Sequence, residues 1–344
     1  MKKTLLALSA LSLVLASGCS QEKTVAVALK KSIGVAIPAA DHGWTAGVGW
    51  WAEETIQAHP EIEWQYQRAA DIKTQADQVE AMLVKGVDAL VLQPIDSDGL
   101  IPLVKRAREQ GVYVVTVDRG LRDASADLYI AGNNATFGSE AAKFMAEKLG
   151  GKGKIVILRG ISCIVDTERF DGAMSVFQKY PEIEVLGNQP GEWNREKSHA
   201  VMQDFLTKFD HIDAVWAADD DMALGAEQAI REAGRQDEMW IIGGACMKDI
   251  VKRILERDPL YPANVTYPPE MIAAGMGFAM AEVSGAKTAE DIAALLPPQL
   301  GISPEQALSV REGAGGKTQK DFILETRLVT PENAKDFYFP ESPF

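Results

Sequence analysis

The alternation of short apolar runs with longer helical stretches is the feature that most constrains the fold of this chain. In the first part, strands are predicted at 33–37, 64–67, 89–92 and 112–117, with helices at 45–58, 74–85 and 100–110. In the second part, strands are predicted at 154–158, 184–186, 214–217 and 240–243, with helices at 167–179, 196–209 and 222–233. Such alternation is typical of βαβ units on a parallel sheet, whose strands are apolar throughout because both faces are buried.

Two segments show that this pattern is repeated within the chain. GVDALVLQPIDSDG (86–99) and HIDAVWAADDDMALG (211–225) both contain Asp-Ala, an apolar strand and an acidic cluster that begins a helix. A glycine then ends each helix before another apolar strand. We therefore expect an α/β fold of two similarly built, doubly wound parallel-sheet lobes. Further along, 271–283 is predicted to be helical, and 285–322 to be an irregular insertion because it is rich in proline and glycine.

The N-terminus has the pattern of an export signal. Lys2 and Lys3 precede an apolar run over 5–15 that is too short to span a bilayer, and LASGC follows. This stretch is similar to a bacterial lipobox, which predicts a signal peptide at 1–18, lipid modification of Cys19 and a linker over 19–31. Simple cleavage without lipidation is the alternative. The protein is expected in the cell envelope or periplasm, held at a membrane by a lipid anchor only.

Charge and cysteine content exclude several classes of protein. The formal net charge of -14 argues against a nucleic-acid partner, because binding of phosphates needs clustered Lys and Arg. No CxxC motif or Cys/His pair at metal-binding spacing is present, so neither a metal nor a cofactor is expected. Cys163 and Cys246 are expected to be free buried thiols, although an oxidising compartment would also permit a disulfide between them.

Polar and aromatic residues follow the predicted strands. In open parallel sheets, ligands bind beyond the carboxyl ends of the strands, so these positions are candidates for a binding site. In the first lobe they are Asp41, His42, Trp44, Gln93, Asp118 and Arg119. In the second lobe they are Arg169, Trp193 and Asp219, with the loops 163–169 and 243–247. Carboxylates and guanidinium groups that face hydroxyls, with tryptophans as flat apolar plates, suit a neutral polyhydroxylated ligand.

Several motifs together resemble the ribose- and galactose-type periplasmic sugar-binding proteins. They are VDALVLQPIDSD, VVTVDRG, TERFDGA, VLGNQPGEWNREK with VMQDF three residues later, and AVWAADDDMALGA. The resemblance covers about 32–284 and resumes at ILETRLVT (323–330). It implies two lobes joined by three hinge crossings, near Gly132, Tyr267 and Glu325. The lobes would comprise 32–131 plus 267–324 and 132–266 plus 325–344.

The resemblance also implies a set of ligand-binding residues. Asp118, Arg119 and Arg169 match the ribose-type site outright. Asp41, Gln93 and Asp219 stand at asparagine positions, Trp44 and Trp193 at positions of phenylalanine, and Tyr267 at a glutamine position. Ala245 departs from the pattern, which has an aspartate in that loop. The ligand is therefore expected to be a pentose, a hexose or a sugar alcohol, with ribose not singled out.

The implied function is capture of a monosaccharide or sugar alcohol and its delivery to the transmembrane subunits of an ABC permease, which works with a cytoplasmic ATPase. This is binding without catalysis. A receptor that presents the sugar to a chemotaxis or sensor-kinase partner is an alternative. An envelope glycoside hydrolase is a weaker one, because neighbouring arginines are expected to lower the pKa of the acids and leave no proton donor. In the run 219–221, Asp219 is the ligand candidate, and Asp220 or Asp221 is expected to cap the following helix.

Overall fold

The structure is a computed structural model, and it describes residues 30–344. Residues Lys31–Phe344 form one compact unit. The predicted signal peptide (1–18), Cys19 and nearly all of the predicted linker lie outside the described residues. Within the part of the chain that the structure does describe, every helix is too short or too polar to cross a bilayer.

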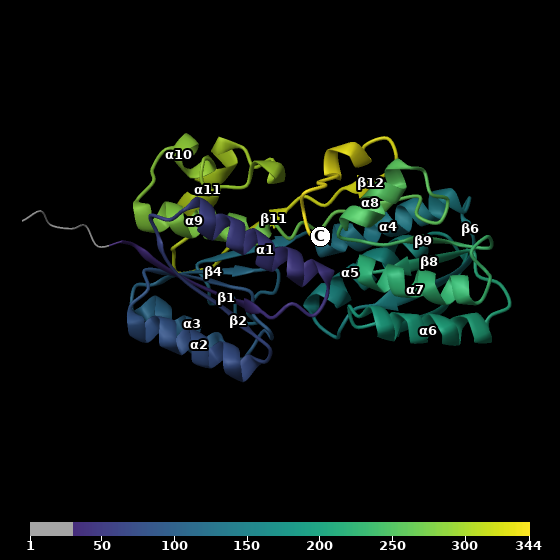
Figure 1. Cartoon of the computed structure of the whole chain (residues 1–344), viewed down its shortest axis with the longest axis horizontal. Coiled ribbons are helices and arrows are strands. Elements are labelled where there is room, and N and C mark those ends of the chain that lie inside the picture. Colours follow the sequence, from purple (N-terminus) through teal and green to yellow (C-terminus); the bar gives the residue numbers. More distant parts are fainter. Residues whose placement is uncertain (1–29) are drawn as a thin grey trace, which may run out of the picture. The chain divides into compact units, whose positions relative to one another are not determined.

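The first sheet contains six parallel strands in the order β11-β5-β4-β3-β1-β2. They are β1 (Ser32–Pro38), β2 (Glu63–Ala69), β3 (Ala89–Leu92), β4 (Tyr113–Val117), β5 (Leu128–Gly132) and β11 (Lys320–Leu324). Helices α1 (Gly43–Ala58) and α9 (Met271–Ser284) cover one face, and α2 (Ile72–Lys85) and α3 (Ile101–Glu109) cover the other (Figure 1). All residues of β3 and β4 are buried, as expected for strands covered on both sides.

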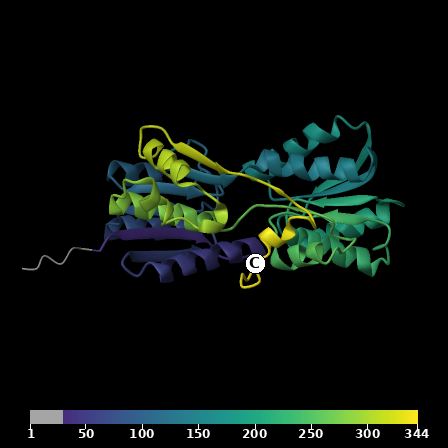
Figure 2. The same cartoon turned by 90° about the horizontal axis from the view of Figure 1, so that it is seen from above.

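The second sheet contains four parallel strands in the order β7-β6-β8-β9. They are β6 (Lys152–Arg159), β7 (Glu182–Pro190), β8 (Ala214–Ala217) and β9 (Trp240–Ile242). Helices α4 (Asn134–Lys148) and α5 (Ile164–Phe177) pack on each other, as do α6 (Arg195–Lys208) and α7 (Asp220–Glu232), and the two pairs lie on opposite faces of the sheet (Figure 2). Helix α8 (Lys248–Leu255) follows β9. The predicted α/β fold with two parallel-sheet lobes is therefore confirmed.

The chain passes between the two sheets at three places. It goes from β5 to α4 through Asn133, from β10 (Asn264–Val265) to α9 through 266–270, and from β11 to β12 (Leu328–Val329) through 325–327. Strands β10 and β12 pair antiparallel, and Figure 2 shows the yellow C-terminal segment running from one sheet to the other. These crossings occur where the resemblance implies them, while the exact lobe boundaries stay a prediction.

The segment 285–322 differs from the expectation. Instead of an irregular insertion it contains α10 (Ala289–Ala293), the 3-10 helix η1 (Pro298–Leu300), α11 (Pro304–Gly313) and the start of β11; a second 3-10 helix, η2 (Ala334–Phe337), lies nearer the C-terminus. The Ser303 side chain accepts a hydrogen bond from the Gln306 backbone N–H and caps α11, and Pro304 is favourable at the first helical position. Buried Ile292, Ala307 and Val310 then hold these helices to the core.

Candidate functional site

A narrow cavity of about 40 Å³ lies at the carboxyl ends of strands from both sheets. Every residue of the predicted site except Asp41 and Gln93 lines it: His42, Trp44, Asp118, Arg119, Arg169, Trp193, Asp219 and Tyr267. Because these residues come from widely separated parts of the sequence, the fold brings the predicted polar and aromatic groups together around one space.

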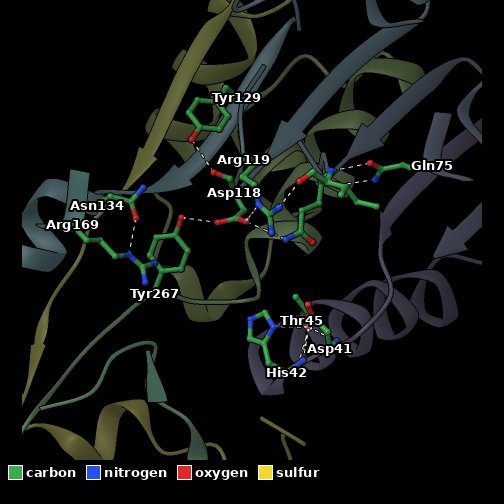
Figure 3. Close-up of polar contacts among 12 residues, drawn as sticks. Asp41, His42, Thr45, Gln75, Asp118, Arg119, Tyr129, Asn134, Arg169 and Tyr267 are labelled. Atoms are coloured by element: carbon green, nitrogen blue, oxygen red, sulfur yellow. Dashed lines mark hydrogen bonds and ion pairs between the residues drawn. The ribbon is translucent and has the colours of Figure 1, made fainter. Parts of the chain in front are cut away.

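Asp118 directly follows β4 and is held rigidly. Its backbone φ is 64°, which is uncommon for a residue other than glycine and is tolerated best by Asp and Asn. The Tyr267 hydroxyl donates to Asp118 Oδ1 at 2.9 Å, and Gln93 Nε2 donates to Oδ2 at 3.1 Å (Figure 3). Both bonds fix the direction of a carboxylate that can accept further hydrogen bonds from a ligand.

Arg119 extends beside Asp118 and is anchored to the neighbouring loop. Its Nη1 donates to the Ile95 carbonyl oxygen at 2.6 Å, and its Nε lies 3.7 Å from Asp118 Oδ2. A donor and an acceptor are therefore presented side by side at the end of a fully buried strand, which is a stiff support for hydroxyl recognition.

Gln93 and Asp41 do not line the cavity but contact residues that do. Gln93 is buried and contacts Asp118, while the exposed Asp41 carboxylate turns toward its neighbours: His42 Nδ1 lies 2.6 Å from Asp41 Oδ1, and the Thr45 hydroxyl donates to the same oxygen at 3.0 Å. The hydrogen bond from His42 is the main cause that lowers the pKa of Asp41 to about 2. Both residues are thus placed to orient residues that line the cavity.

Arg169 comes from α5 and is 4% exposed. Its Nη1 donates to the Ala218 carbonyl oxygen at 2.7 Å. Figure 3 shows its second bond, in which Nε donates to Asn134 Oδ1 at 3.1 Å. The guanidinium carbon lies 4.0 Å from the ring centroid of Phe137 and 4.4 Å from that of Tyr267, so cation–π contacts help to hold it. Asn134 is a positioning residue that the sequence analysis did not identify.

The two tryptophans form apolar walls of the cavity. Trp44 Nε1 donates to the Tyr267 carbonyl oxygen at 2.9 Å, which fixes the indole beside the cavity that it lines. Trp193 has a φ of 56°, and its ring passes so close to Gly160 that a Cβ there would lie 1.8 Å from a ring atom. A side chain at position 160 would therefore displace Trp193 from its present place.

The acidic run 219–221 is arranged differently from the expectation. Asp219 itself caps α7, because its Oδ1 accepts from the Met222 backbone N–H at 2.9 Å, and it also lines the cavity. Asp220 instead accepts from the backbone N–H groups of Gly244 and Met247, at 2.9 Å and 2.7 Å. The prediction that Asp220 or Asp221 caps the helix is wrong, since their side chains bind elements that are distant in sequence.

Burial shifts the pKa of Asp219, and hydrogen bonding together with nearby charges shifts that of His42. Burial raises the pKa of Asp219 from 3.8 to about 6, against the opposing charges of His42 and Arg169. Burial also disfavours the charged form of His42, but the hydrogen bond to Asp41 and the charges of Asp219 and Asp221 outweigh it and raise the His42 pKa. The expectation that arginines lower the pKa of the acids therefore fails for Asp219, because burial dominates.

The raised pKa of Asp219 predicts a pH dependence of stability. The folded protein holds a proton on Asp219 more tightly than the unfolded chain does, so this stabilisation is present at low pH and is lost as pH rises through about 4 to 6. Ionisation of Asp219 in the folded protein therefore lowers the free energy of unfolding at pH 7 by up to about 3 kcal/mol. Asp219→Asn should raise the free energy of unfolding at pH 7, measured with urea. The decrease of this free energy between about pH 4 and 7 should be smaller in the variant than in the wild type.

An asparagine at this position still accepts the hydrogen bond from Met222, so the substitution removes the charge and keeps the cap. Asp249→Asn, which removes one exposed carboxylate from the protein, is the control. An Asp219→Asn variant with the pH profile of the wild type would contradict the assignment.

Cys163, Val165 and Ala245 also line the cavity; the candidate loops 163–169 and 243–247 contain them, but none of the three was named as a ligand-binding residue. Cys163 directly precedes α5, Val165 lies in the first turn of that helix, and Ala245 lies in the loop after β9. Small and apolar side chains of this kind give no chemical signal. Ala245 has a φ of 82° and occupies the loop where the ribose-type pattern has an aspartate. Cys163 and Cys246 are free thiols, as expected, although both are partly exposed.

Residues 33–288 match the family model described as a periplasmic binding protein domain. The chain therefore belongs to the periplasmic binding protein family, and the resemblance inferred from its motifs is confirmed.

Curated relatives carry names of sugar- and polyol-binding proteins. The chain is 32% identical over 229 residues to the xylitol-binding protein of Mycolicibacterium smegmatis, in an alignment covering 66% of this chain and 65% of that protein. It is 34% identical over 203 residues to the ribose import binding protein RbsB of Bacillus subtilis, which covers 59% of this chain and 65% of that protein. The chain thus spans slightly less than two thirds of the length of both relatives.

Among solved structures, the chain is similar to the fructose binding periplasmic domain of a hybrid two component system. The TM-score is 0.69 at 26% sequence identity, and the alignment covers 90% of this chain and 93% of that domain. The proteins named in these comparisons are all binding proteins or binding domains.

Proposed function

We propose that this chain is the solute-binding protein of an ABC-type importer, which captures a monosaccharide or a sugar alcohol and delivers it to a membrane permease. The observation that carries the proposal is the convergence of carboxylates, arginines and tryptophans from both sheets on one cavity. The names of the curated relatives, which bind xylitol and ribose, support the same class of ligand.

The chemistry of the cavity suits a neutral ligand with several hydroxyl groups. Asp118 and Asp219 accept hydrogen bonds from hydroxyls, and Arg119 and Arg169 donate them. Trp44 and Trp193 offer flat faces to the C–H side of a ring or chain. Each hydroxyl that a ligand lacks would leave a buried polar partner unsatisfied, at a cost of about 1–3 kcal/mol, so the cavity selects among similar sugars.

Binding is coupled to closure of the two lobes in this proposal. The cavity is narrow, so a sugar must enter while the lobes are apart, and it then contacts both when they close. A direct contact across the cleft supports this: the Gly43 backbone N–H, at the beginning of α1, donates to Asp221 Oδ2 at 2.6 Å. The positive end of the α1 dipole favours this carboxylate.

Asp221→Ala is expected to weaken sugar binding roughly tenfold. Loss of one charge-assisted hydrogen bond makes the free energy of lobe closure less favourable by about 1.5 kcal/mol. Asp221 does not line the cavity, so a change in the dissociation constant by isothermal titration would report closure instead of direct contact. Asp221→Asn keeps an acceptor for Gly43 and should bind within about threefold of the wild type. Equal affinity of the alanine variant and the wild type would show that this contact has no part in closure.

The proposed function is tested by isothermal titration with pentoses, hexoses and the corresponding alditols. We expect heat of binding with at least one of them, at one ligand per chain, without added calcium. A response from none of these compounds would overturn the sugar proposal.

A sensor role is the second candidate, because a solved structure similar to this chain is the fructose binding domain of a two component system. The same cavity would then present the ligand to a signalling partner. Pull-down of envelope membranes with the sugar-loaded protein, followed by identification of the captured proteins, separates a permease partner from a sensor.

A hydrolase would use a carboxylic acid as proton donor, and Asp219 has a pKa near 6 that suits this role. We propose binding without catalysis, because Asp219 also caps α7 and its partners across the cavity are arginines and a histidine. Mass spectrometry of the ligand after prolonged incubation with the protein should show no chemical change. A shortened glycoside among the products would establish catalysis.

We also propose export to the periplasm with lipid modification at Cys19. Cys19→Ala should release the protein into the soluble periplasmic fraction and abolish incorporation of labelled palmitate, because in this proposal the acylated Cys19 is the membrane anchor. Ser20→Ala is the matched control and should keep both the label and the membrane fraction. Labelling that persists in the Cys19→Ala variant would place the anchor elsewhere.

A further inference from the structure

A second cavity has a volume of about 390 Å³, compared with about 40 Å³ for the first. It lies where the crossing segments meet the C-terminal part of the chain. Its walls come from the crossing residues 266–270, the end of β11 and the residues after it, the loop 245–248, the connection 299–306 and the C-terminal segment. Figure 1 shows this yellow segment beside α8 and ending near α1. Phe344 and Pro269 both lie beside Gly47 of α1, where an added Cβ would be 2.9 Å from Phe344 and 3.1 Å from Pro269.

Glu270 is an unusual member of this wall. It is 7% exposed, and its Oε2 has no hydrogen-bond partner in the described part of the chain. Burial raises its pKa to about 7, opposed only by a hydrogen bond from its own backbone N–H. A buried carboxyl group without a partner is costly, so its presence in a cavity indicates that a ligand supplies the missing donor.

The other charged groups around this cavity are engaged or exposed. Lys248 Nζ donates to the Ser342 carbonyl oxygen at 2.6 Å, and Arg327 is paired with Glu325 at 2.5 Å. Asp336 is exposed to solvent, and Cys246, which faces Glu270, carries a thiol whose pKa is raised by burial. The cations of the wall are therefore engaged by oxygens of the chain, whereas no cation contributes to the electrostatics of the Glu270 carboxyl group.

One part of the wall is apolar and includes Phe322, Leu324, Phe337 and Phe344, while the rest of the wall is polar. We propose that this cavity is a second binding site, which takes a small organic cation with an apolar body and pairs its ammonium group with Glu270. The ammonium would satisfy the carboxylate, and the apolar body would fill the aromatic part of the cavity.

Occupancy of this site should affect the sugar site. Tyr267 and Ala245 line both cavities, and Tyr267 also donates to Asp118. The crossing segments 266–270 and 325–327 carry the movement between the lobes, so a ligand held between them favours one arrangement over the other. This coupling rests on the proposed sugar-binding function, whereas binding of the cation does not. The coupling is reciprocal, so the sugar should change the affinity for the cation by the same factor as the cation changes the affinity for the sugar.

The site is tested directly by titration of the protein with 2-phenylethylamine at about pH 8, where the Glu270 carboxyl is mostly ionised. Its neutral analogue 2-phenylethanol and the anion 3-phenylpropanoate serve as matched probes. We expect the amine to bind at least about tenfold more tightly than the alcohol, and the anion to bind weakest.

Glu270→Gln should weaken binding of the amine at least about tenfold and change binding of the alcohol by less than about threefold. Glu325→Gln removes a charge from the same wall that is exposed and already paired, and it should leave amine binding unchanged. Ile302→Trp, which fills the cavity from a wall outside the crossings, should abolish binding of both amine and alcohol.

Equal amine affinity in the wild type and Glu270→Gln, or amine binding that survives Ile302→Trp, would overturn the proposal, as would no binding of the amine at millimolar concentration. The coupling is measured in the same samples as the change in amine affinity at saturating sugar. A change of at least about threefold supports it, and identical affinity in both conditions overturns it. Failure of sugar binding in the titration panel would leave the result for the amine standing, so the two proposals fail separately.

Discussion

Arg169→Ala should reduce sugar affinity at least about 100-fold, the largest loss that we expect from any single residue of the site. Removal of one partner from a buried, hydrogen-bonded charged contact costs about 2–5 kcal/mol. In the part of the chain that the structure describes, protein acceptors take Nε and one N–H of Nη1, so the two N–H groups of Nη2 are left for a ligand. Isothermal titration with the tightest sugar of the panel measures the loss.

The control for this substitution is Arg159→Ala. Arg159 lies in the same lobe, and its guanidinium carbon also lies 4.0 Å from an aromatic ring, that of Phe170, but it does not line the cavity. Its loss should change the affinity by less than about threefold. Arg169→Lys keeps the charge without the planar fork and should still lose about tenfold, which guards against misfolding of the alanine variant. Near-normal affinity of Arg169→Lys and Arg169→Ala would contradict the account.

Gly138→Ala should destabilise the protein by about 3 kcal/mol, the largest effect on stability that we expect from one added methyl group. Helices α4 and α5 approach closely at this point, and a Cβ on Gly138 would lie 1.8 Å from the carbonyl oxygen of Arg169. The obstacle is backbone, so the helices must separate to relieve it. Urea unfolding measures the loss of stability.

Because the displaced carbonyl belongs to Arg169, the same substitution should also weaken sugar binding in the molecules that remain folded. Ser139→Ala on the same helix is the control and should change the free energy of unfolding by less than about 1 kcal/mol. A Gly138→Ala variant as stable as the wild type would show that α4 and α5 do not pack as closely as described.

The strands that sequence predicts best are those buried on both faces. The predictions at 89–92 and 214–217 coincide with β3 and β8, where every residue is buried. Strand β7 is predicted only at 184–186 but runs over Glu182–Pro190, because it lies at the edge of its sheet and most of its side chains are partly or fully exposed. Strands β5 and β11 are missing from the prediction. They pair with each other from distant parts of the chain, so tertiary contacts and not a local pattern make them strands.

A residue of the candidate site can be predicted from the sequence where its type and its position at a strand end already indicate its chemistry. Asp118, Arg119 and Arg169 are recognised by residue type and position. Asp41 and Gln93 have the same signals but do not line the cavity, and their side chains are engaged by His42 and by Asp118. Only packing decides which polar residues reach the cavity and which support those that do.

The double substitution Arg119→Ala/Asp219→Ala, compared with the wild type by isothermal titration against the pentoses, hexoses and alditols, tests the central claim most directly. If residues of both lobes bind one polyhydroxylated ligand at once, the wild type binds it. The variant, which lacks one binding side chain in each lobe, gives no heat at millimolar concentration. Binding of that ligand by the variant with the affinity of the wild type would show that the cavity is not where the ligand is held.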